Sequence, residues 1–396
     1  MTDTPDPGRV VIVGAGQGGL QAAISLRQEG HTGPITLIGD EPGLPYQRPP
    51  LSKAYLKTGV AEQLTLRPES FFEKKDITLR PGLRVDRIDR ENRQVVAGGE
   101  VLDYDHLILA TGTRNLRPPI PGVERALGLR TLADARALRD ALDTPQRVAV
   151  IGGGFIGLEF AAVARALGHT VHVAEAAPRL MSRVISPEMS ERFRCLHDSL
   201  GTVLHLGNGV SDVSGDGLVL SDGTEVAANL ILLAAGVRPN TELAEAAGLM
   251  VDNGIVVDTR LRTENPHIYA LGDCAVFLDP ATGRPVRLES VQAATDHARA
   301  IAKSIVHDAA DPYAAVPWFW SDQADWKLQI AGLATASDDS VPVGEDTVLR
   351  FAGDRLTAVE CINNAKIHMK ARRLLAQPDV PTRDMLARET YDLTSF

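Results

Sequence analysis

Two glycine-rich segments have the residue types and spacing that bind the pyrophosphate of a dinucleotide. They are Gly14-Ala15-Gly16-Gln17-Gly18-Gly19 and Gly152-Gly153-Gly154-Phe155-Ile156-Gly157, and each follows a short apolar run. In such a motif the first glycine makes a tight turn, the second lets the backbone approach the phosphates, and the third lets a helix pack closely on a strand. The phosphates lie at the helix N-terminus, where free N–H groups favour anions. Two copies in one chain predict two bound dinucleotides.

An acidic residue follows the second strand-like segment of each unit. Asp40 comes after residues 35–38, and Glu175 comes after residues 170–173. A carboxylate at this place accepts hydrogen bonds from the adenosine ribose hydroxyls and repels a 2′-phosphate, so Glu175 favours NADH over NADPH. Arg179 and Arg183 follow Glu175 and would soften that preference. The alternative is that both carboxylates are ordinary acids at strand ends.

The order of the segments predicts which unit holds which cofactor. Apolar strands that end in small-residue turns recur at Ala110-Thr111-Gly112, at Ala234-Ala235-Gly236 and at Gly272-Asp273. The first unit opens the chain and is completed by the Gly272-Asp273 turn, so we expect this split domain to enclose a tightly held FAD. Asp273 would then bond a ribityl hydroxyl or a pyrophosphate-linked group; the alternative is a solvated turn aspartate. The compact inserted unit would be the exchangeable nicotinamide site.

These elements predict an α/β chain with an NAD domain inserted into an FAD domain, both Rossmann-like, followed by a C-terminal α+β domain. The FAD domain would comprise residues 1–112 and 237–315, the NAD domain residues 113–236, and the last domain residues 316–396. Helical spacing of apolar residues predicts a helix over 291–306, and a basic helix is expected near 365–375.

Composition narrows the class of protein. A chain of 396 residues is too long for one ordinary core, so two or three domains are expected. The formal charge of −10 argues against general affinity for nucleic acid. Residues 1–7 have neither a basic n-region nor an apolar h-region, and no apolar run approaches the ~20 residues that span a bilayer. A cytoplasmic protein is therefore expected.

The cysteines carry no sign of a redox dithiol or of a metal site. Cys195, Cys274 and Cys361 are far apart, and no cysteine occurs between Asp40 and Arg67. We expect all three to be ordinary structural residues and predict no bound metal. A flavin in this chain would have to pass its electrons directly outward.

Two longer segments have a more specific resemblance. They are Arg48-Pro49-Pro50-Leu51-Ser52-Lys53 and Trp318-Phe319-Trp320-Ser321-Asp322-Gln323. Together with both glycine motifs and Gly236-Val237-Arg238-Pro239-Asn240, the chain resembles, over essentially its whole length, the oxygenase-coupled NADH-dependent ferredoxin reductases of the putidaredoxin and biphenyl-dioxygenase type. Apoptosis-inducing factor is a more distant relative. The resemblance implies a glutathione-reductase-like fold.

The resemblance also implies roles for charged residues. Arg48 would pair with the FAD pyrophosphate, which suits its planar fork. Lys53 would lie near flavin N5 and pair with Glu159, which would also bond the nicotinamide carboxamide. Phe155 and Ile156 would border the slot in which nicotinamide stacks on the flavin. The alternative for Lys53 and Glu159 is two unrelated surface charges.

Aromatic residues and a helix start complete the flavin site that the resemblance implies. Trp320 would cover one rim of the flavin beside Trp318, unless these aromatics only fill a core. Val291 and Gln292 would face the flavin N1–C2=O end, where a helix N-terminus stabilises negative charge. Hydride passes between the two cofactors, so Lys53 and Glu159 act by positioning and no covalent catalyst is expected. The residues expected to bind FAD are Gly14, Gly16, Gly19, Asp40, Arg48, Lys53, Ala110, Thr111, Gly112, Asp273, Val291, Gln292 and Trp320. Those expected to bind NAD are Gly152, Gly154, Phe155, Ile156, Gly157, Glu159, Glu175, Arg183 and Gly236.

The leading interpretation is an enzyme that takes hydride from NADH and passes single electrons to a [2Fe–2S] ferredoxin, which supplies a cytochrome P450 or a dioxygenase. Ferredoxins are usually acidic, so docking needs a local basic patch. Lys366, Lys370 and Arg373 have helical spacing, with Arg372 adjacent, and residues 361–378 contain no acid. The alternative is a solvated helix face. The competing functions are a rubredoxin reductase and a signalling flavoprotein like apoptosis-inducing factor; an NADH oxidase is disfavoured because that group relies on a cysteine near the flavin.

Overall fold

The computed structural model describes residues 8–280, 282–307 and 311–396. The N-terminal segment 1–7, on which the sequence argument about a signal peptide rests, lies outside these residues. None of the described helices combines the length and the apolar character that crossing a bilayer requires. The chain forms two compact units, one of residues 1–47, 62–114 and 238–315, the other of residues 48–61, 115–237 and 316–396. The domain boundaries expected from the sequence, after residues 112, 236 and 315, stay a prediction.

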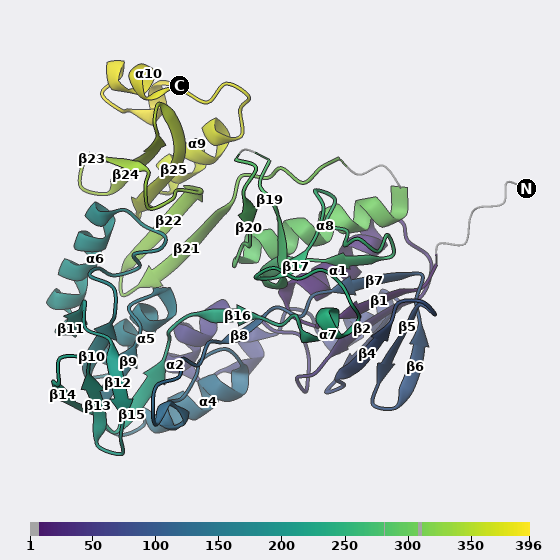
Figure 1. The fold of residues 1–396 in the computed structure, drawn as a ribbon, viewed down its shortest axis with the longest axis horizontal. Coiled ribbons are helices and arrows are strands. Elements are labelled where there is room, and N and C mark those ends of the chain that lie inside the picture. Colours follow the sequence, from purple (N-terminus) through teal and green to yellow (C-terminus); the bar gives the residue numbers. More distant parts are fainter. Residues whose placement is uncertain (1–7, 281, 308–310) are drawn as a thin grey trace, which may run out of the picture. The chain divides into compact units, whose positions relative to one another are not determined.

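The first unit is built on a five-stranded parallel sheet in the order β18-β7-β1-β2-β3. Its strands are short and mostly apolar, as burial of a parallel sheet on both faces requires; all four residues of β1 are buried. Around it lie the long helices α1 and α8, shorter helices and two small three-stranded sheets (Figure 1). The strands of the main sheet are β1 (Val10–Val13), β2 (Ile35–Gly39), β3 (Ile77–Pro81), β7 (His106–Leu109) and β18 (Ile268–Ala270). The remaining elements are α1 (Gln17–Gln28), α3 (Glu69–Lys74), α7 (Glu242–Ala246), α8 (Val291–His307), η4 (Gly272–Cys274), β4 (Val85–Asp89), β5 (Gln94–Ala97), β6 (Glu100–Asp103), β17 (Ile255–Val256), β19 (Ala275–Leu278) and β20 (Pro285–Val286).

Helices α1 and α8 lie side by side in this unit (Figure 1). A Cβ on Gly18 would lie 3.5 Å from the Cβ of Ala294, which shows how closely the two backbones approach. The helix expected over 291–306 is confirmed as α8. Its apolar stripe faces inward, although Val291 and Ile305 at its ends are only half-buried.

The second unit contains a four-stranded parallel sheet in the order β11-β10-β9-β15 and a three-stranded antiparallel sheet, β12-β13-β14. Buried apolar residues of the two sheets share one core. The segment of residues 48–61 joins this unit through η1 and α2, which contact α4 and α5. The strands are β9 (Arg147–Ile151), β10 (Thr170–Glu175), β11 (Val203–Leu206), β12 (Val210–Val213), β13 (Gly217–Leu220), β14 (Glu225–Ala227) and β15 (Leu230–Leu233). The helices are η1 (Pro49–Ser52), α2 (Ala54–Thr58), η3 (Val123–Arg125), α4 (Leu132–Ala141), α5 (Phe155–Ala166) and α6 (Pro187–Ser199). Three further elements, η2 (Ala61–Leu64), β8 (Thr113–Asn115) and β16 (Val237–Pro239), lie where the chain crosses between the units.

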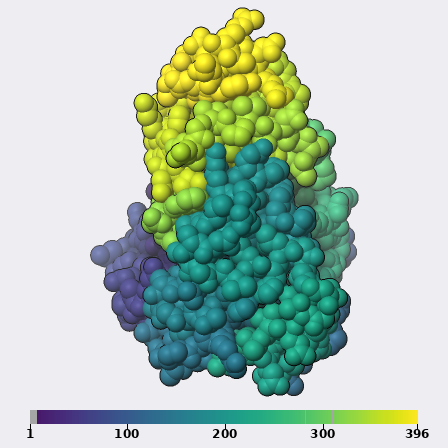
Figure 2. Space-filling model, turned by 90° about the vertical axis from the view of Figure 1, so that its left-hand side faces the viewer, coloured from purple at the N-terminus to yellow at the C-terminus, as the bar shows by residue number. Residues whose placement is uncertain are grey.

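The C-terminal part of the second unit is an antiparallel sheet in the order β21-β22-β25-β24-β23 with helices α9 and α10. The expected α+β character and the basic helix are confirmed, since α9 covers Ala365–Leu375. Figure 2 shows this part, yellow-green to yellow, packed against the teal residues of the same unit. The elements are β21 (Trp318–Gln323), β22 (Trp326–Gly332), β23 (Asp339–Val343), β24 (Thr347–Ala352), β25 (Arg355–Ile362), α9 (Ala365–Leu375), α10 (Arg383–Arg388) and η5 (Leu393–Ser395).

A fully buried histidine fixes the turn after β18. Nδ1 of His297 in α8 accepts a hydrogen bond of 3.1 Å from the N–H of Gly272. The ring packs edge-on against Tyr313 and Phe277, with centroid distances of 4.5 and 5.4 Å. Burial lowers the pKa of His297 from 6.5 to about 3. The imidazole is therefore neutral in the folded protein at neutral pH.

This histidine predicts a loss of stability in mild acid. Between the two pKa values, the unfolded chain binds a proton at His297 that the folded chain does not, so the free energy of unfolding falls by up to about 1.4 kcal/mol per pH unit as the pH decreases below 6.5. In His297→Asn the amide oxygen can still accept the hydrogen bond from Gly272. The new side chain does not titrate, so the pH-dependent loss of stability caused by His297 is removed. We expect the midpoint of thermal unfolding to fall less steeply in the variant than in the wild type between about pH 7 and about pH 5. Parallel curves would contradict the assignment.

Candidate dinucleotide-binding sites

The first glycine motif forms a turn that only glycine can make. Gly14 has φ +109°, and a Cβ there would lie 2.1 Å from the carbonyl oxygen of Ala110. A Cβ on Gly19 would lie 1.9 Å from the oxygen of Gly14. Gly16, the N-cap of α1, has nothing within 4 Å of its Cβ position. The open side of the turn at a helix N-terminus fits the pyrophosphate of a dinucleotide.

The other predicted FAD residues of the first unit gather at the same edge of its sheet. Strands β1, β7 and β18 are parallel, so the segments that follow them meet: the Gly14 turn, residues 110–112 and the Gly272-Asp273 turn. Oδ2 of Asp273 accepts a hydrogen bond of 3.2 Å from Oγ1 of Thr113. Asn240 holds the turn after β7: its side-chain amide and its N–H donate to the carbonyl oxygens of Thr111 and Gly112, and its carbonyl oxygen accepts from Oγ1 of Thr111. These hydrogen bonds connect the segments that meet at this edge.

Three further predicted residues lie near this edge. Asp40 directly follows β2 and is exposed, so its carboxylate is accessible to a ribose. The start of α8 supplies Val291 and Gln292; the amide of Gln292 is buried and donates to Asp296 at 2.6 Å. The first unit thus brings together Gly14, Gly16, Gly19, Asp40, Ala110, Thr111, Gly112, Asp273, Val291 and Gln292.

The second glycine motif repeats the geometry of the first. Gly152 has φ +112°, and a Cβ there would lie 2.4 Å from the oxygen of Ala234. A Cβ on Gly157 would lie 2.3 Å from the oxygen of Gly152. Gly154 caps α5 and again has nothing within 4 Å of its Cβ position. This unit therefore offers a second cradle of the same shape.

Glu175 at the end of β10 is held in place by backbone N–H groups. Its Oε2 accepts from Gly153 at 2.6 Å and its Oε1 accepts from Ala177 at 2.7 Å. Each oxygen keeps a lone pair that can accept from a ribose hydroxyl. The carboxylate is thus oriented beside the fingerprint before any cofactor binds.

The two arginines that follow differ in what they can do. The guanidinium of Arg179 is committed to the fold, since it donates to the carbonyl oxygens of Ser182 and Ile185 and to Oγ of Ser190. Arg183 is exposed, and its guanidinium lies 3.5 Å from the position of a Cβ on Gly236, the turn after β15. Only Arg183 of this pair can reach a cofactor phosphate or ribose.

Lys53 and Glu159 are in contact and are not separate surface charges. Nζ of Lys53 lies 2.8 Å from Oε2 of Glu159, whose side chain is only 5% exposed. Ser52 donates to the same oxygen at 2.6 Å, and Ser321 of β21 donates to Oε1 at 2.7 Å. A cavity of about 220 Å³ borders this cluster, and Asp322 also lines it. Two segments that are distant from α5 in the sequence, and from each other, thus satisfy its buried carboxylate.

The hydrogen-bond chain continues into the core from Ser321. Nε2 of Gln323 donates to Oγ of Ser321 at 3.2 Å, and Oε1 of Gln323 lies 3.0 Å from Nε2 of His197 in α6. All three side chains are fully buried. Ser52, Ser321 and Gln323 were not among the site residues predicted from the sequence. The signal was present, because these residues lie inside the two segments that carried the family resemblance.

The aromatic residues of β21 are half-buried and do more than fill a core. Trp318 and Trp320 stack with ring centroids 5.8 Å apart, and Phe319 packs edge-on against Phe155 at 5.1 Å. The guanidinium carbon of Arg372 lies 4.4 Å from the ring centroid of Trp318. This aromatic strand therefore contacts both the start of α5 and the basic helix α9.

Arg48 donates to the carbonyl oxygen of Arg130 at 2.8 Å, also within the second unit. This unit thus contains every predicted NAD residue together with Arg48, Lys53 and Trp320, which were predicted for FAD. The residues predicted to bind FAD are accordingly divided between the two units, and the role of each stays a prediction.

The basic surface of α9 differs in detail from the sequence expectation. Lys366 and Arg373 are exposed, Lys370 is half-buried, and Arg372 lies over Trp318. Asp392 is close to the lysines: the N–H and hydroxyl of Thr394, with smaller contributions from Lys366 and Lys370, hold the pKa of its carboxyl below the usual range. The basic patch therefore has an acidic neighbour, Asp392, which lies outside the acid-free segment of residues 361–378.

Comparison with known proteins identifies relatives over the whole chain. Residues 8–298 match the pyridine nucleotide-disulphide oxidoreductase family, and residues 318–396 match the reductase C-terminal family. A rhodocoxin reductase of Rhodococcus erythropolis is 44% identical, with 97% of this chain and 93% of that protein covered. A rubredoxin-NAD(+) reductase of Pseudomonas putida is 40% identical, covering 90% of this chain and 96% of that protein.

A solved complex of putidaredoxin reductase with putidaredoxin superimposes with a TM-score of 0.91 at 37% identity, covering 98% of this chain and 97% of that one. These similarities confirm the expected fold, the resemblance to the reductases, and the use of FAD and a nicotinamide dinucleotide. Despite the family's description, all three cysteines of this chain are free thiols, with Cys274 and Cys361 buried and Cys195 exposed.

The Glu159 cluster yields a prediction on flavin reduction. Glu159→Gln removes the charge that holds Lys53, and Ser321→Ala removes one donor to the carboxylate. A hydrogen bond to a charged group contributes about 1.5–3 kcal/mol. We expect reduction of bound FAD by NADH to slow roughly 10- to 100-fold in Glu159→Gln and by about threefold to tenfold in Ser321→Ala, as measured by stopped-flow absorbance. Ser214→Ala is the control. It removes a hydroxyl that donates a hydrogen bond to the carbonyl oxygen of Gly217, in another sheet. A Ser321→Ala rate equal to that of the wild type would refute the prediction.

Proposed function

The chain belongs to the pyridine nucleotide-disulphide oxidoreductase family, and we propose that it is an NADH-dependent ferredoxin reductase with FAD as its cofactor. In this proposal it takes hydride from NADH and passes electrons singly to a [2Fe–2S] ferredoxin that supplies a cytochrome P450 or a dioxygenase. The observation that carries it is the combination of two complete glycine cradles with three cysteines that are all free thiols and lie far apart in the sequence. Electrons that enter as hydride then have to leave from the flavin itself.

FAD, when bound, accepts the hydride of NADH and releases its electrons one at a time. The residues proposed to hold FAD include the Gly14 turn and Asp273, and those proposed to hold NADH include the Gly152 turn and Glu175. Glu175 is fixed by two backbone N–H groups, so it presents a carboxylate where a 2′-phosphate would be repelled. This favours NADH as the reductant.

Lys53 and Glu159 are proposed to act as a positioning pair. The carboxylate of Glu159 lies 2.8 Å from the ammonium of the half-buried Lys53. The serine donors leave Glu159 a single orientation, which keeps the ammonium of Lys53 in one place. Phe155 would limit water access next to this pair.

The carrier protein distinguishes the two leading functions. A relative named as a ferredoxin–NAD(P)(+) reductase and one named as a rubredoxin-NAD(+) reductase are both 40% identical to this chain, so overall similarity does not separate the two functions. The deciding experiment follows NADH consumption by the FAD-loaded protein with cytochrome c and either a [2Fe–2S] ferredoxin or a rubredoxin. Strong acceleration by ferredoxin supports the proposal, whereas acceleration by rubredoxin alone favours the alternative. Slow hydride transfer with long-lived reduced flavin would instead favour the signalling flavoprotein.

We propose further that the docking surface for the ferredoxin includes Lys366, Lys370, Arg372 and Arg373 on α9. An acidic carrier would be attracted by this face, and the attraction would weaken with salt. The cytoplasmic location also stays a proposal.

Charge reversal tests the docking surface. In the double variant Lys366→Glu/Lys370→Glu, we expect the KM for ferredoxin to rise roughly tenfold at low salt, because encounter with an acidic partner is no longer favoured. Flavin reduction by NADH should be unchanged. Lys303→Glu, an exposed lysine on α8, serves as the matched control. Unaltered ferredoxin kinetics in the double variant would exclude this face.

A further inference from the structure

A buried ion pair lies in the C-terminal sheet of the second unit. Nη1 of Arg350 (β24) is 2.8 Å from Oε1 of Glu360 (β25), and the two side chains are 3% and 1% exposed. Nη2 of Arg350 also donates to the carbonyl oxygens of Thr335 and Asp338, at 2.9 and 3.2 Å. Burying a charged pair is costly, so the presence of the pair is by itself weak evidence that it stabilises the fold. We therefore infer the role of this pair from the contacts that it makes outside its own sheet.

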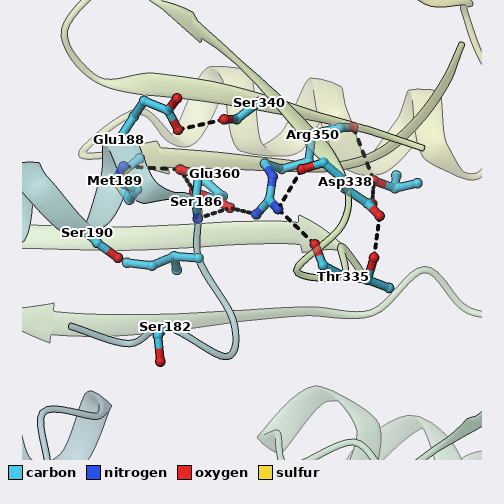
Figure 3. Close-up of polar contacts among 12 residues, drawn as sticks. Ser182, Ser186, Glu188, Met189, Ser190, Thr335, Asp338, Ser340, Arg350 and Glu360 are labelled. Carbon is cyan, nitrogen blue, oxygen red and sulfur yellow. Dashed lines mark hydrogen bonds and ion pairs between the residues drawn. The ribbon is translucent and has the colours of Figure 1, made fainter. Parts of the chain in front are cut away.

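Glu360 points out of its own sheet and binds the start of helix α6 (Figure 3). Its two carboxylate oxygens accept from the N–H of Ser186 at 2.9 and 3.0 Å, and Oε2 accepts from Oγ of Ser186 at 2.7 Å. Ser186 is the N-cap of α6, and its Oγ accepts from the N–H of Met189. The negative charge thus lies at a helix N-terminus, where it is favoured.

Ser186 also ends the loop of residues 179–185, which lies on the second glycine motif. The N–H of Met181 donates to the carbonyl oxygen of Gly153 at 2.9 Å. Leu180 is fully buried, and one of its methyl carbons lies 2.9 Å from the Cβ position of Gly153. The loop is therefore attached to the fingerprint at one end and to Glu360 at the other.

Arg183 is the exposed charged residue of this loop. Arg183 lies between the two attachments and approaches Gly236. A second contact from the C-terminal sheet restrains the same region, because Oγ of Ser340 donates to Glu188 of α6 at 2.6 Å (Figure 3). The C-terminal part of the unit thus fixes the place from which Arg183 projects.

We propose that Arg350 and Glu360 are positioning residues for the nicotinamide dinucleotide. They hold the loop of residues 179–185 on the second glycine motif, and through it they place Arg183, so that an ion pair in the C-terminal sheet sets the affinities for NADH and NADPH. The inference rests on the proposed function, because it takes the second glycine motif as the NADH site.

The test uses the FAD-loaded full-length chain and anaerobic stopped-flow reduction at varied NADH and NADPH. In Glu360→Gln, Ser186 keeps an acceptor but the charge is lost. Arg350→Met/Glu360→Met removes both charges, so that neither is left buried and unpaired. Ser186→Ala is a third variant that loses both hydrogen bonds of the hydroxyl, to Glu360 and from Met189, and keeps the backbone N–H that binds Glu360. Arg383→Met is the matched control. It removes an exposed ion pair between Arg383 of α10 and Asp339 of β23, a strand of the same sheet.

We expect the Kd for NADH to rise about tenfold in the first two variants and about threefold in Ser186→Ala, with the limiting rate of flavin reduction changed by less than about twofold. The ratio of the NADPH to the NADH Kd should also change, while FAD retention and the control stay as in the wild type. Because the pair acts through Arg183, Glu360→Gln should have little effect on the NADH Kd in an Arg183→Ala background.

Three results would overturn the inference. One is an unchanged NADH Kd in variants with a lower melting temperature, which means that the pair only stabilises the fold. Another is an equal rise in Kd with and without Arg183. The third is a wild-type flavin that NADH does not reduce, which overturns the proposed function as well, whereas the first two leave the proposed function intact.

Discussion

The carboxylate of Glu159 is the constraint on which the second unit depends. A charge that is 95% removed from solvent is stable only when its oxygens are fully bonded, and this one draws its donors from two distant segments. Lys53 and Ser52 come from the segment of residues 48–61, and Ser321 comes from β21. The carboxylate itself belongs to α5, the helix of the second glycine motif. Because Glu159 needs these partners, the segment of residues 48–61 and strand β21 have to pack against α5.

The two glycine cradles show how one backbone shape can serve two ligands. Gly14 and Gly152 have nearly the same φ, and each meets the carbonyl oxygen at the end of a neighbouring strand. The acidic residues beside them differ: Asp40 is exposed, whereas Glu175 is fixed by two backbone N–H groups. A preoriented carboxylate suits a cofactor that exchanges in every turnover, because less ordering is needed on each binding event.

Much of the fold could be predicted because its signals are local. Apolar runs before glycine turns gave β1 and β9, and the spacing of basic and apolar residues gave α9 from Ala365 to Leu375. The Lys53–Glu159 contact could not be derived from spacing; only the family resemblance suggested it. Three contacts depend on how segments pack in space. They are the hydrogen bond that Ser321 donates to Glu159, the bonds of Arg179 within its own loop, and the approach of Asp392 to Lys366. No sequence pattern of one segment contains that information.

The aromatic strand β21 has a consequence for spectroscopy. The chain has three tryptophans, and all of them lie in the hairpin of β21 and β22, at Trp318, Trp320 and Trp326. Trp318 touches the guanidinium of Arg372 on the basic helix, and Trp326 packs on Phe193 of α6. The intrinsic tryptophan emission of the protein is therefore a local signal from one hairpin. An acidic protein that draws Arg372 away from Trp318 would change that emission, so carrier binding can be followed by fluorescence without any attached dye.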